Sequence, residues 1–338
     1  MLRNVLLVGT LALCAIGTML AYGFTKPFIT AQASAAQEAM TGDWTAKIRE
    51  TPKGTVLWLS LTSNTDSRRG NWQSSSDFPI GDFTGLNPNA GNTQFSLQRE
   101  AGTIVFAGLF SQGKGVGEFR FTPNNNFAAA MRGQGDEELS TQKLFTMALH
   151  DVGTRFIAEL RALGYDKVPV NKLIAMRIHG ADGNFIREIE SAGYKQVTVD
   201  KLIAMRIHGV DKEFIAKARS LGYGELTVDK LITMRIHGIN EEYIKSVQAL
   251  GYNNVPFDKL VSMKIHNVNG EFIKELDSFG YNSLSVDKLI TLRIHNVNGK
   301  FIKEMRESGF NNLSVDDLIK LRIHGVDSNY VRRMKGNN

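Results

Sequence analysis

The chain has 338 residues, of which 42% are hydrophobic and 22% charged, and its 40 basic and 34 acidic residues give a formal net charge of +6. The two signs are interspersed along the chain, whereas a nucleic-acid-binding protein concentrates its lysines and arginines, so we expect no nucleic-acid partner. The single cysteine, Cys14, lies near the N-terminus, which excludes disulfides, thiolate metal sites and a cysteine nucleophile from the rest of the chain.

Residues 1–35 have the pattern of an export signal peptide. Arg3 provides a basic start, residues 5–24 are mostly apolar, and residues 31–35 offer small-residue cleavage sites. The alternative is an uncleaved membrane anchor, because about 20 apolar residues also span a bilayer. We therefore expect an exported protein, periplasmic or extracellular, which is anchored to the inner membrane through residues 5–24 if the leader is retained.

Residues 41–123 predict a β-domain, because alternation replaces helical spacing and the turns are rich in Gly, Asn and Pro. The candidate strands cover residues 42–48, 55–62, 70–76, 93–99, 102–110 and 115–122. Six or more antiparallel strands in so short a segment favour a small β-sandwich or an open barrel.

Three tryptophans in this segment are candidates for stacking on a sugar or a peptide. Trp58 lies in an apolar strand, so we expect it in the core, while Trp72, flanked by polar residues, is the best exposed ligand-binding candidate. Residues 36–149 contain no histidine or cysteine, so Ser-His-Asp and Cys-His catalytic machinery is absent there.

Residues 124–338 contain a repeated unit, because the chain's seven histidines recur every 29 residues, as do series of leucines, aromatic residues and glycines. The histidines are His150, His179, His208, His237, His266, His295 and His324. We expect about seven repeats.

Each unit reads as two short helices. In one copy, Thr198 is a candidate N-cap for a first helix whose apolar stripe runs to Ile207, and Gly209 ends that helix in a left-handed conformation. Asp211 then caps a second helix, which Gly222 stops. Helices of about ten residues are marginal alone, so the units must stack. The predicted fold is α+β and multidomain: a small antiparallel β-domain followed by an α-solenoid of two-helix repeats.

The histidine series invites a metal or pH-sensing interpretation. Adjacent units are separated by two helix layers of about 8–10 Å each, whereas zinc needs nitrogens at about 2.0–2.1 Å from one ion. We therefore expect no metal and no cofactor. The favoured role is capping of free carbonyls or interaction with the helix dipole, and a pH-responsive ladder is the alternative.

A basic residue two positions before each histidine, except in the first copy, forms a second series. The basic series comprises Arg177, Arg206, Arg235, Lys264, Arg293 and Arg322. One interpretation is structural, with these residues pairing with helix C-termini of neighbouring units or with aspartates. Those aspartates are Asp200, Asp229, Asp258, Asp287 and Asp316. The other is functional: together with Trp72, the series is the candidate ligand-binding set, gripping an acidic or extended peptide.

The segments FSLQREAGTIVFAGLFSQGKGVGEFRFTPNNNF and LGYGELTVDKLITMRIHGINEEYI resemble those of bacterial exported and envelope proteins that pair a small β-domain with helical repeats of this length. Similar segments look to be appended, on the sensor side, to membrane zinc metallopeptidases of the beta-lactam sensor type. The resemblance covers residues 42–334. The chain has no HExxH motif, so the resemblance implies an extracytoplasmic accessory or recognition module without peptidase activity, and it supplies no ligand.

The leading hypothesis is a non-enzymatic, exported recognition or scaffold protein that binds a protein or peptide through its helical repeats. One alternative is a β-domain that binds carbohydrate or a small ligand, with the repeats as a rigid spacer. Another, based on the resemblance alone, is a regulator of an envelope peptidase or signalling system.

Overall fold

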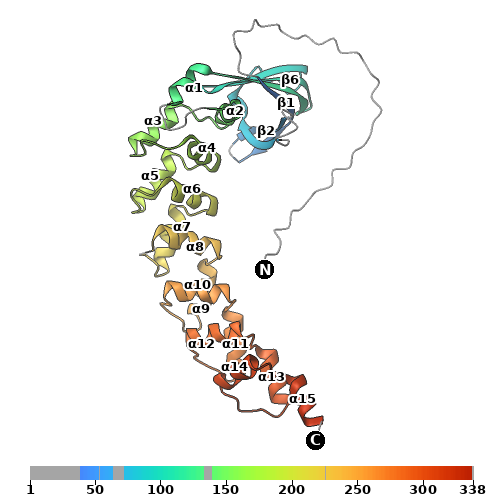
Figure 1. Cartoon of the computed structure of the whole chain (residues 1–338), viewed down its shortest axis with the longest axis vertical. Coiled ribbons are helices and arrows are strands. Elements are labelled where there is room, and N and C mark those ends of the chain that lie inside the picture. Colours follow the sequence, from blue (N-terminus) through green and yellow to red (C-terminus); the bar gives the residue numbers. More distant parts are fainter. Residues whose placement is uncertain (1–38, 53, 64–71, 133–138, 225, 337–338) are drawn as a thin grey trace, which may run out of the picture. The chain divides into compact units, whose positions relative to one another are not determined.

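The computed structural model describes residues 39–52, 54–63, 72–132, 139–224 and 226–336 (Figure 1). The expected leader, residues 1–35, and Cys14 lie outside the described residues. None of the helices in these ranges has both the length and the apolar character that a transmembrane span requires.

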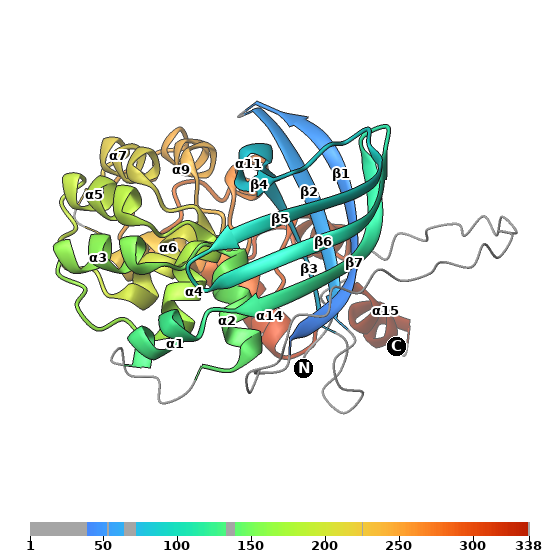
Figure 2. The same ribbon diagram turned by 90° about the horizontal axis from the view of Figure 1, so that it is seen from above.

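The first part of the described chain is one curled antiparallel sheet of seven strands in the order β3-β2-β1-β7-β6-β5-β4 (Figure 2). The strands are β1 (Met40–Thr51), β2 (Gly54–Ser63), β3 (Trp72–Pro79), β4 (Phe83–Thr84), β5 (Gly91–Arg99), β6 (Gly102–Ser111) and β7 (Lys114–Pro123). All six predicted strands are confirmed, and the two-residue β4 is an addition. Of the two expected forms, the single curled sheet corresponds to the open barrel and not to the sandwich.

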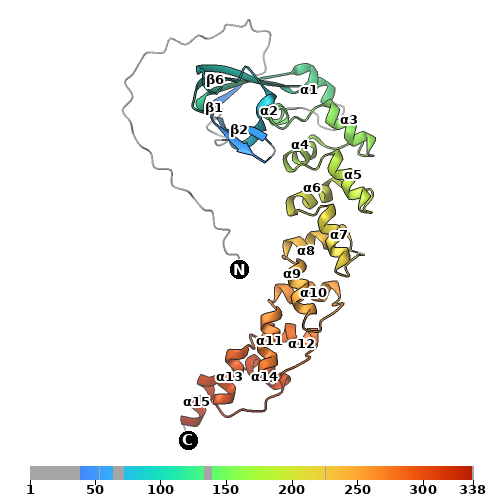
Figure 3. The same cartoon turned by 180° about the vertical axis from the view of Figure 1, so that it is seen from behind.

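A helix covers the inner face of this sheet. Figure 3 shows α2 (Thr141–Leu149) beside the sheet. Phe145 of this helix is fully buried and packs within 5.3–5.4 Å, between ring centroids, of Trp72, Phe119 and Phe121. The sheet therefore completes its core with a helix from the first repeated unit, instead of with a second sheet.

The described residues form fifteen helices in all. The others are α1 (Asn125–Met131), α3 (Thr154–Ala162), α4 (Val170–His179), α5 (Gly183–Ser191), α6 (Val199–His208), α7 (Lys212–Ser220), α8 (Val228–Ile236), α9 (Glu241–Gln248), α10 (Phe257–Ile265), α11 (Gly270–Ser278), α12 (Val286–Ile294), α13 (Gly299–Glu307), α14 (Val315–Ile323) and α15 (Ser328–Gly336). From α2 onward each repeated unit contributes two of these helices, as the sequence predicts.

The predicted stop signals and the start signals of the second helices are confirmed. Thr198 is at the N-cap position of α6, as predicted, but its side chain makes no capping hydrogen bond there. The residue after each histidine has a φ of 54–70°, whether it is Gly, Asn or Asp, so backbone shape is what this position requires. Gly222 and its equivalents in five other copies have φ of 86–95°. Asp211 and its five counterparts accept a hydrogen bond of 2.7–3.0 Å from the N–H three residues on.

Successive units are joined by first helices that contact one another, α4 with α6, α6 with α8, α10 with α12 and α12 with α14. A tyrosine that follows the second helix adds a polar tie, because its partly buried hydroxyl donates to a carbonyl in the corresponding loop of the next unit, at 2.7–3.0 Å. The pairs are Tyr165–Val197, Tyr194–Leu226, Tyr223–Val255, Tyr252–Leu284 and Tyr281–Leu313. These loop ties recur at the same register along the chain.

Candidate functional site

Each member of the basic series lies over an aromatic ring on the second helix of the preceding unit, with its cationic centre 3.9–5.2 Å from the ring centroid. The pairs are Arg177–Phe156, Arg206–Phe185, Arg235–Phe214, Lys264–Tyr243, Arg293–Phe272 and Arg322–Phe301. One face of each cation therefore packs between units, where a cation over an aromatic ring contributes about 0.5–2 kcal/mol.

The expected pairing of this series with the five aspartates from Asp200 to Asp316 is wrong, although Arg177 forms an ion pair of 2.9 Å with another aspartate, Asp151. Those aspartates pair instead with lysines that lie more than one helical turn before the basic series. The pairs are Lys172–Asp200, Lys201–Asp229, Lys230–Asp258, Lys259–Asp287 and Lys288–Asp316. The other structural option is seen twice: Arg177 donates to the His150 carbonyl at 2.9 Å and Arg322 to the Asn296 carbonyl at 3.1 Å, both at helix C-termini.

Burial has an electrostatic consequence for one member of the series. The Nε of Arg293 is buried and has no hydrogen-bond partner among the described residues. Desolvation lowers the pKa of its guanidinium, opposed by the charge of Glu275. Arg206 and Arg235 are, by contrast, exposed. The members of the series thus share one geometry but differ in how much of each cation a ligand could reach.

The isoleucine that follows each member of the basic series is 49–56% exposed. These residues, named here the isoleucine stripe, are Ile178, Ile207, Ile236, Ile265, Ile294 and Ile323. The prediction that Ile207 belongs to the buried stripe of its helix is therefore wrong, since burial in that helix ends with Leu202, Ile203 and Met205. In the first copy the equivalent residue, Leu149, is buried because its helix lies against the sheet.

The histidines lie at the C-terminal ends of the first helices, as expected. Within the described residues, however, their imidazoles make no hydrogen bond to a helix carbonyl, so a capping role is not seen. Burial lowers the pKa of the His150 imidazole, and the charge of Arg177 lowers it further. The described ranges contain no cluster of three or more His, Cys, Asp or Glu side chains that could hold a metal ion.

The three tryptophans of the sheet have different surroundings from those expected. Trp44 is the fully buried one, and its Nε1 donates to the carbonyls of Ala107 and Glu118 at 3.3 and 3.1 Å. Trp58 is half-buried on the opposite face of the sheet, with the guanidinium of Arg49 4.7 Å from its ring. The expectation that Trp58 belongs to the core is therefore wrong, because the inward positions of its strand are the neighbouring leucines.

Trp72, the predicted ligand-binding tryptophan, is half-buried at the start of β3. Its ring meets that of Phe145 edge to face, so one side of Trp72 helps to hold α2 against the sheet. The structure does not bring Trp72 together with the basic series through any contact among the described residues.

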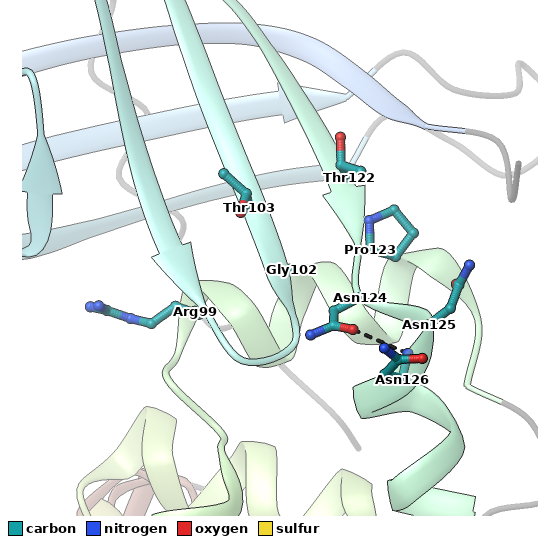
Figure 4. Close-up of a pocket in the computed structure, with 8 residues that line it drawn as sticks. All are labelled: Arg99, Gly102, Thr103, Thr122, Pro123, Asn124, Asn125 and Asn126. Carbon is teal, nitrogen blue, oxygen red and sulfur yellow. Dashed lines mark hydrogen bonds between the residues drawn. The ribbon is translucent and has the colours of Figure 1, made fainter. Parts of the chain in front are cut away.

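A hollow of about 410 Å³ lies where β5, β6 and β7 meet α1, lined by Arg99 and a polar run from Thr122 to Asn126 (Figure 4). Two of its polar side chains, those of Arg99 and Asn124, are already engaged. Arg99 lies 2.7 Å from Asp82 and 3.3 Å from Asp151, and the Asn124 side chain caps α1. A second hollow, of about 290 Å³, lies between α7, α8 and α9.

Comparison with known proteins gives no match: no family model, no curated protein and no solved structure matches this chain.

Proposed function

We propose that this protein is a non-enzymatic, exported recognition protein that binds a protein or peptide along its helical repeats, which stack as an α-solenoid. The single observation that carries the proposal is the isoleucine stripe. An isolated exposed isoleucine is ordinary, but six in register at one position of successive units form a repeated apolar feature, which is typical of a binding surface. Burying the exposed half of one such side chain contributes about 1 kcal/mol.

The basic series precedes the isoleucine stripe residue by residue, and in this proposal it provides polar contacts to the same partner. Each cation precedes an isoleucine in the chain and is held in place by stacking on a neighbouring ring, so it reaches solvent with little rotamer freedom left to lose. Arg206 and Arg235 are the most accessible members and would pair with acidic groups on an apolar partner segment. Periodic attachment points favour an extended or helical partner over a compact ligand.

The test is capture of partners from an envelope extract by the full chain and by a stripe variant, Ile207→Gln, Ile236→Gln and Ile265→Gln. Glutamine keeps helix propensity and approximate size while removing apolar surface. We expect the stripe variant to lose the captured partner. The matched control changes two exposed apolar residues of the sheet, Leu109→Thr and Val116→Thr, and should capture normally. Loss in the control but not in the stripe variant would contradict the proposal.

A second candidate function is carbohydrate or small-ligand binding by the sheet, with the helices as a spacer. The observation that favours it is the half-exposed ring of Trp58, which lies opposite Asp77 in the β2–β3 register and carries Arg49 over its face. An aromatic ring beside charged groups is a usual sugar-stacking arrangement. Trp58→Ala should abolish retention on immobilised cell-wall glycan if this is correct, and Trp72→Ala tests the tryptophan that the sequence favours in the same assay.

Regulation of an envelope peptidase is a third possibility that rests on the resemblance alone. It is a special case of protein recognition, with the peptidase as the partner.

A further inference from the structure

The second helix of one unit lacks a core side chain that the other units have. Ala218 of α7 is at a buried position where the equivalents are larger. Those equivalents are Leu160, Ile189, Val247, Leu276 and Met305, each at most 1% exposed. Replacing such a side chain by alanine in a packed core leaves a cavity unless the surroundings collapse.

A hollow lies beside Ala218, although the residue itself is only 1% exposed. The hollow of about 290 Å³ between α7, α8 and α9 has Ala218 in its wall, together with the apolar side chains of Phe214, Leu221, Met234 and Ile239. Phe214 is only partly buried, whereas the equivalent rings in the neighbouring copies are buried. The missing side chain therefore coincides with a partly exposed aromatic ring.

Charged groups surround the mouth of this hollow. Lys217 pairs with Glu241, and Arg235 stacks over Phe214 at 4.1 Å. The Asp211 carboxylate caps α7 through the Phe214 N–H. Glu213 has no ion-pair or hydrogen-bond partner in the described part of the chain, so it is the carboxylate left for a ligand.

We propose that the Ala218 hollow binds one bulky apolar side chain of a peptide partner, with a neighbouring basic residue of that peptide pairing with Glu213. The volume exceeds that of one missing side chain, and much of the wall is apolar. At the mouth Arg235 is stacked on Phe214, whereas the Glu213 carboxylate is held by no ion pair or hydrogen bond within the described residues, so apolar bulk next to a cation is the chemistry that fits Glu213. The inference deepens the proposed peptide recognition and rests on it for the identity of the occupant. It would make this unit the anchor point of the array.

The pocket can be tested without the partner by titrating indole into the full chain and following the methyl resonances of Leu221, Met234 and Ile239. We expect saturable shifts in the unchanged chain and none in Ala218→Leu, which restores the side chain of Leu160 and Leu276. Ala218→Val, which introduces the valine of the next copy, serves if leucine overpacks the site.

The matched control for the filled pocket is Val247→Leu, which enlarges the equivalent residue of the next unit and should leave the indole response unchanged. No shift in the unchanged chain, or equal shifts in the chain and both filled variants, would overturn the proposal.

The charge requirement has a separate probe. Acetyl-Trp-Arg-amide should bind roughly two- to fivefold more tightly than acetyl-Trp-Gln-amide, and Glu213→Gln should remove that difference. Equal binding of the two peptides would overturn the assignment of Glu213.

Failure of this inference is distinguishable from failure of the proposed function. The stripe variant keeps the hollow and should still bind indole. If the stripe variant loses partner capture while Ala218→Leu captures normally, the hollow is not the anchor but peptide recognition stands. If indole binds as expected and neither variant affects capture, the proposed function fails.

Discussion

The Glu100 carboxylate, in the turn between β5 and β6, accepts a hydrogen bond of 3.1 Å from the backbone N–H of Thr154, the first residue of α3. In the later units this end of the second helix is capped by the unit's own Asp or Asn, but the first copy has Gly153 there, without a side chain to cap. A Cβ on Gly153 would lie 2.7 Å from Glu100 Oε1. The sheet therefore supplies the cap that the first unit lacks, and the glycine makes room for it.

Glu100→Ala should lower the free energy of unfolding by about 1 kcal/mol, the usual cost of losing an N-cap. Adding Gly153→Asp to this variant should recover most of the loss, because Gly153 has extended backbone angles that an aspartate cap adopts. The same Gly153→Asp change alone should destabilise through contact with Glu100. Urea unfolding of the three variants measures the coupling, and simple additivity would contradict it.

The triple change Arg206→Gln, Arg235→Gln and Arg293→Gln removes three cations from their rings. We expect it to lower the free energy of unfolding by about 1.5–6 kcal/mol, since each stacked cation contributes about 0.5–2 kcal/mol, and to lower the melting temperature accordingly.

The control for the triple change is Lys172→Gln, Lys201→Gln and Lys259→Gln, which alters net charge equally but breaks only exposed ion pairs. Such pairs contribute about 0–1 kcal/mol each, and often nothing measurable. Equal destabilisation by the two triple changes would mean that net charge, and not ring stacking, is responsible.

Helix boundaries were predictable because their signals are local. A left-handed residue, a capping side chain and a stop glycine each act on the backbone within a few positions of themselves. It was harder to predict from the sequence which side of the helix, buried or exposed, each residue occupies. At about 100° per residue, Arg206 lies between Leu202 and Ile203 on the helix circumference, while Ile207 lies about 40° beyond Ile203. The arginine therefore points at the preceding unit, where it stacks on Phe185, and the isoleucine points at solvent. A helical wheel separates these two directions, whereas hydrophobicity alone does not.

In the sheet, the strands were predictable from the sequence, but the face that each tryptophan occupies was not. Alternation predicted six strands, yet it cannot say which alternating set faces inward when both sets contain a tryptophan. Trp44 is buried and Trp58 is not, because α2 and the aromatic residues of the neighbouring strands cover only one face. The helix that covers this face comes from a unit that the sequence assigns to the repeats, so nothing local in either segment predicts the contact between Trp72 and Phe145.

Tyr223→Phe tests the loop ties. Removing the hydroxyl leaves the Val255 carbonyl without its donor, and we expect a loss of about 1 kcal/mol in urea unfolding. Phe310 occupies the equivalent position, and the residues that the structure describes contain no carbonyl 32 positions on for a hydroxyl there to reach, so Phe310→Tyr should change stability little. If Phe310→Tyr raised the free energy of unfolding by as much as Tyr223→Phe lowers it, the hydroxyl would act through some other contact.

Truncation tests whether the units stack as a solenoid. Chains ending at Tyr223, Tyr252 and Tyr281 differ in length by one unit at each step, and in an array stabilised by neighbours the free energy of unfolding should rise in steps with length. Urea melts of the three chains measure the steps. Equal stability of all three, or complete unfolding of all three, would show that the helices do not form such an array.

His150 should make stability depend on pH. Burial and Arg177 lower the pKa of its imidazole below the ordinary value near 6.5, so the neutral form is favoured in the folded chain. Its contribution is then fully present above the unfolded pKa and is lost as the pH falls through the lowered folded pKa, because the unfolded chain takes up the proton first. The free energy of unfolding should therefore fall as the pH is lowered from neutral through and below the ordinary imidazole pKa, and His150→Gln should make that slope shallower. The exposed His208→Gln is the matched control, and an equal change of slope in both variants would contradict a special role for His150.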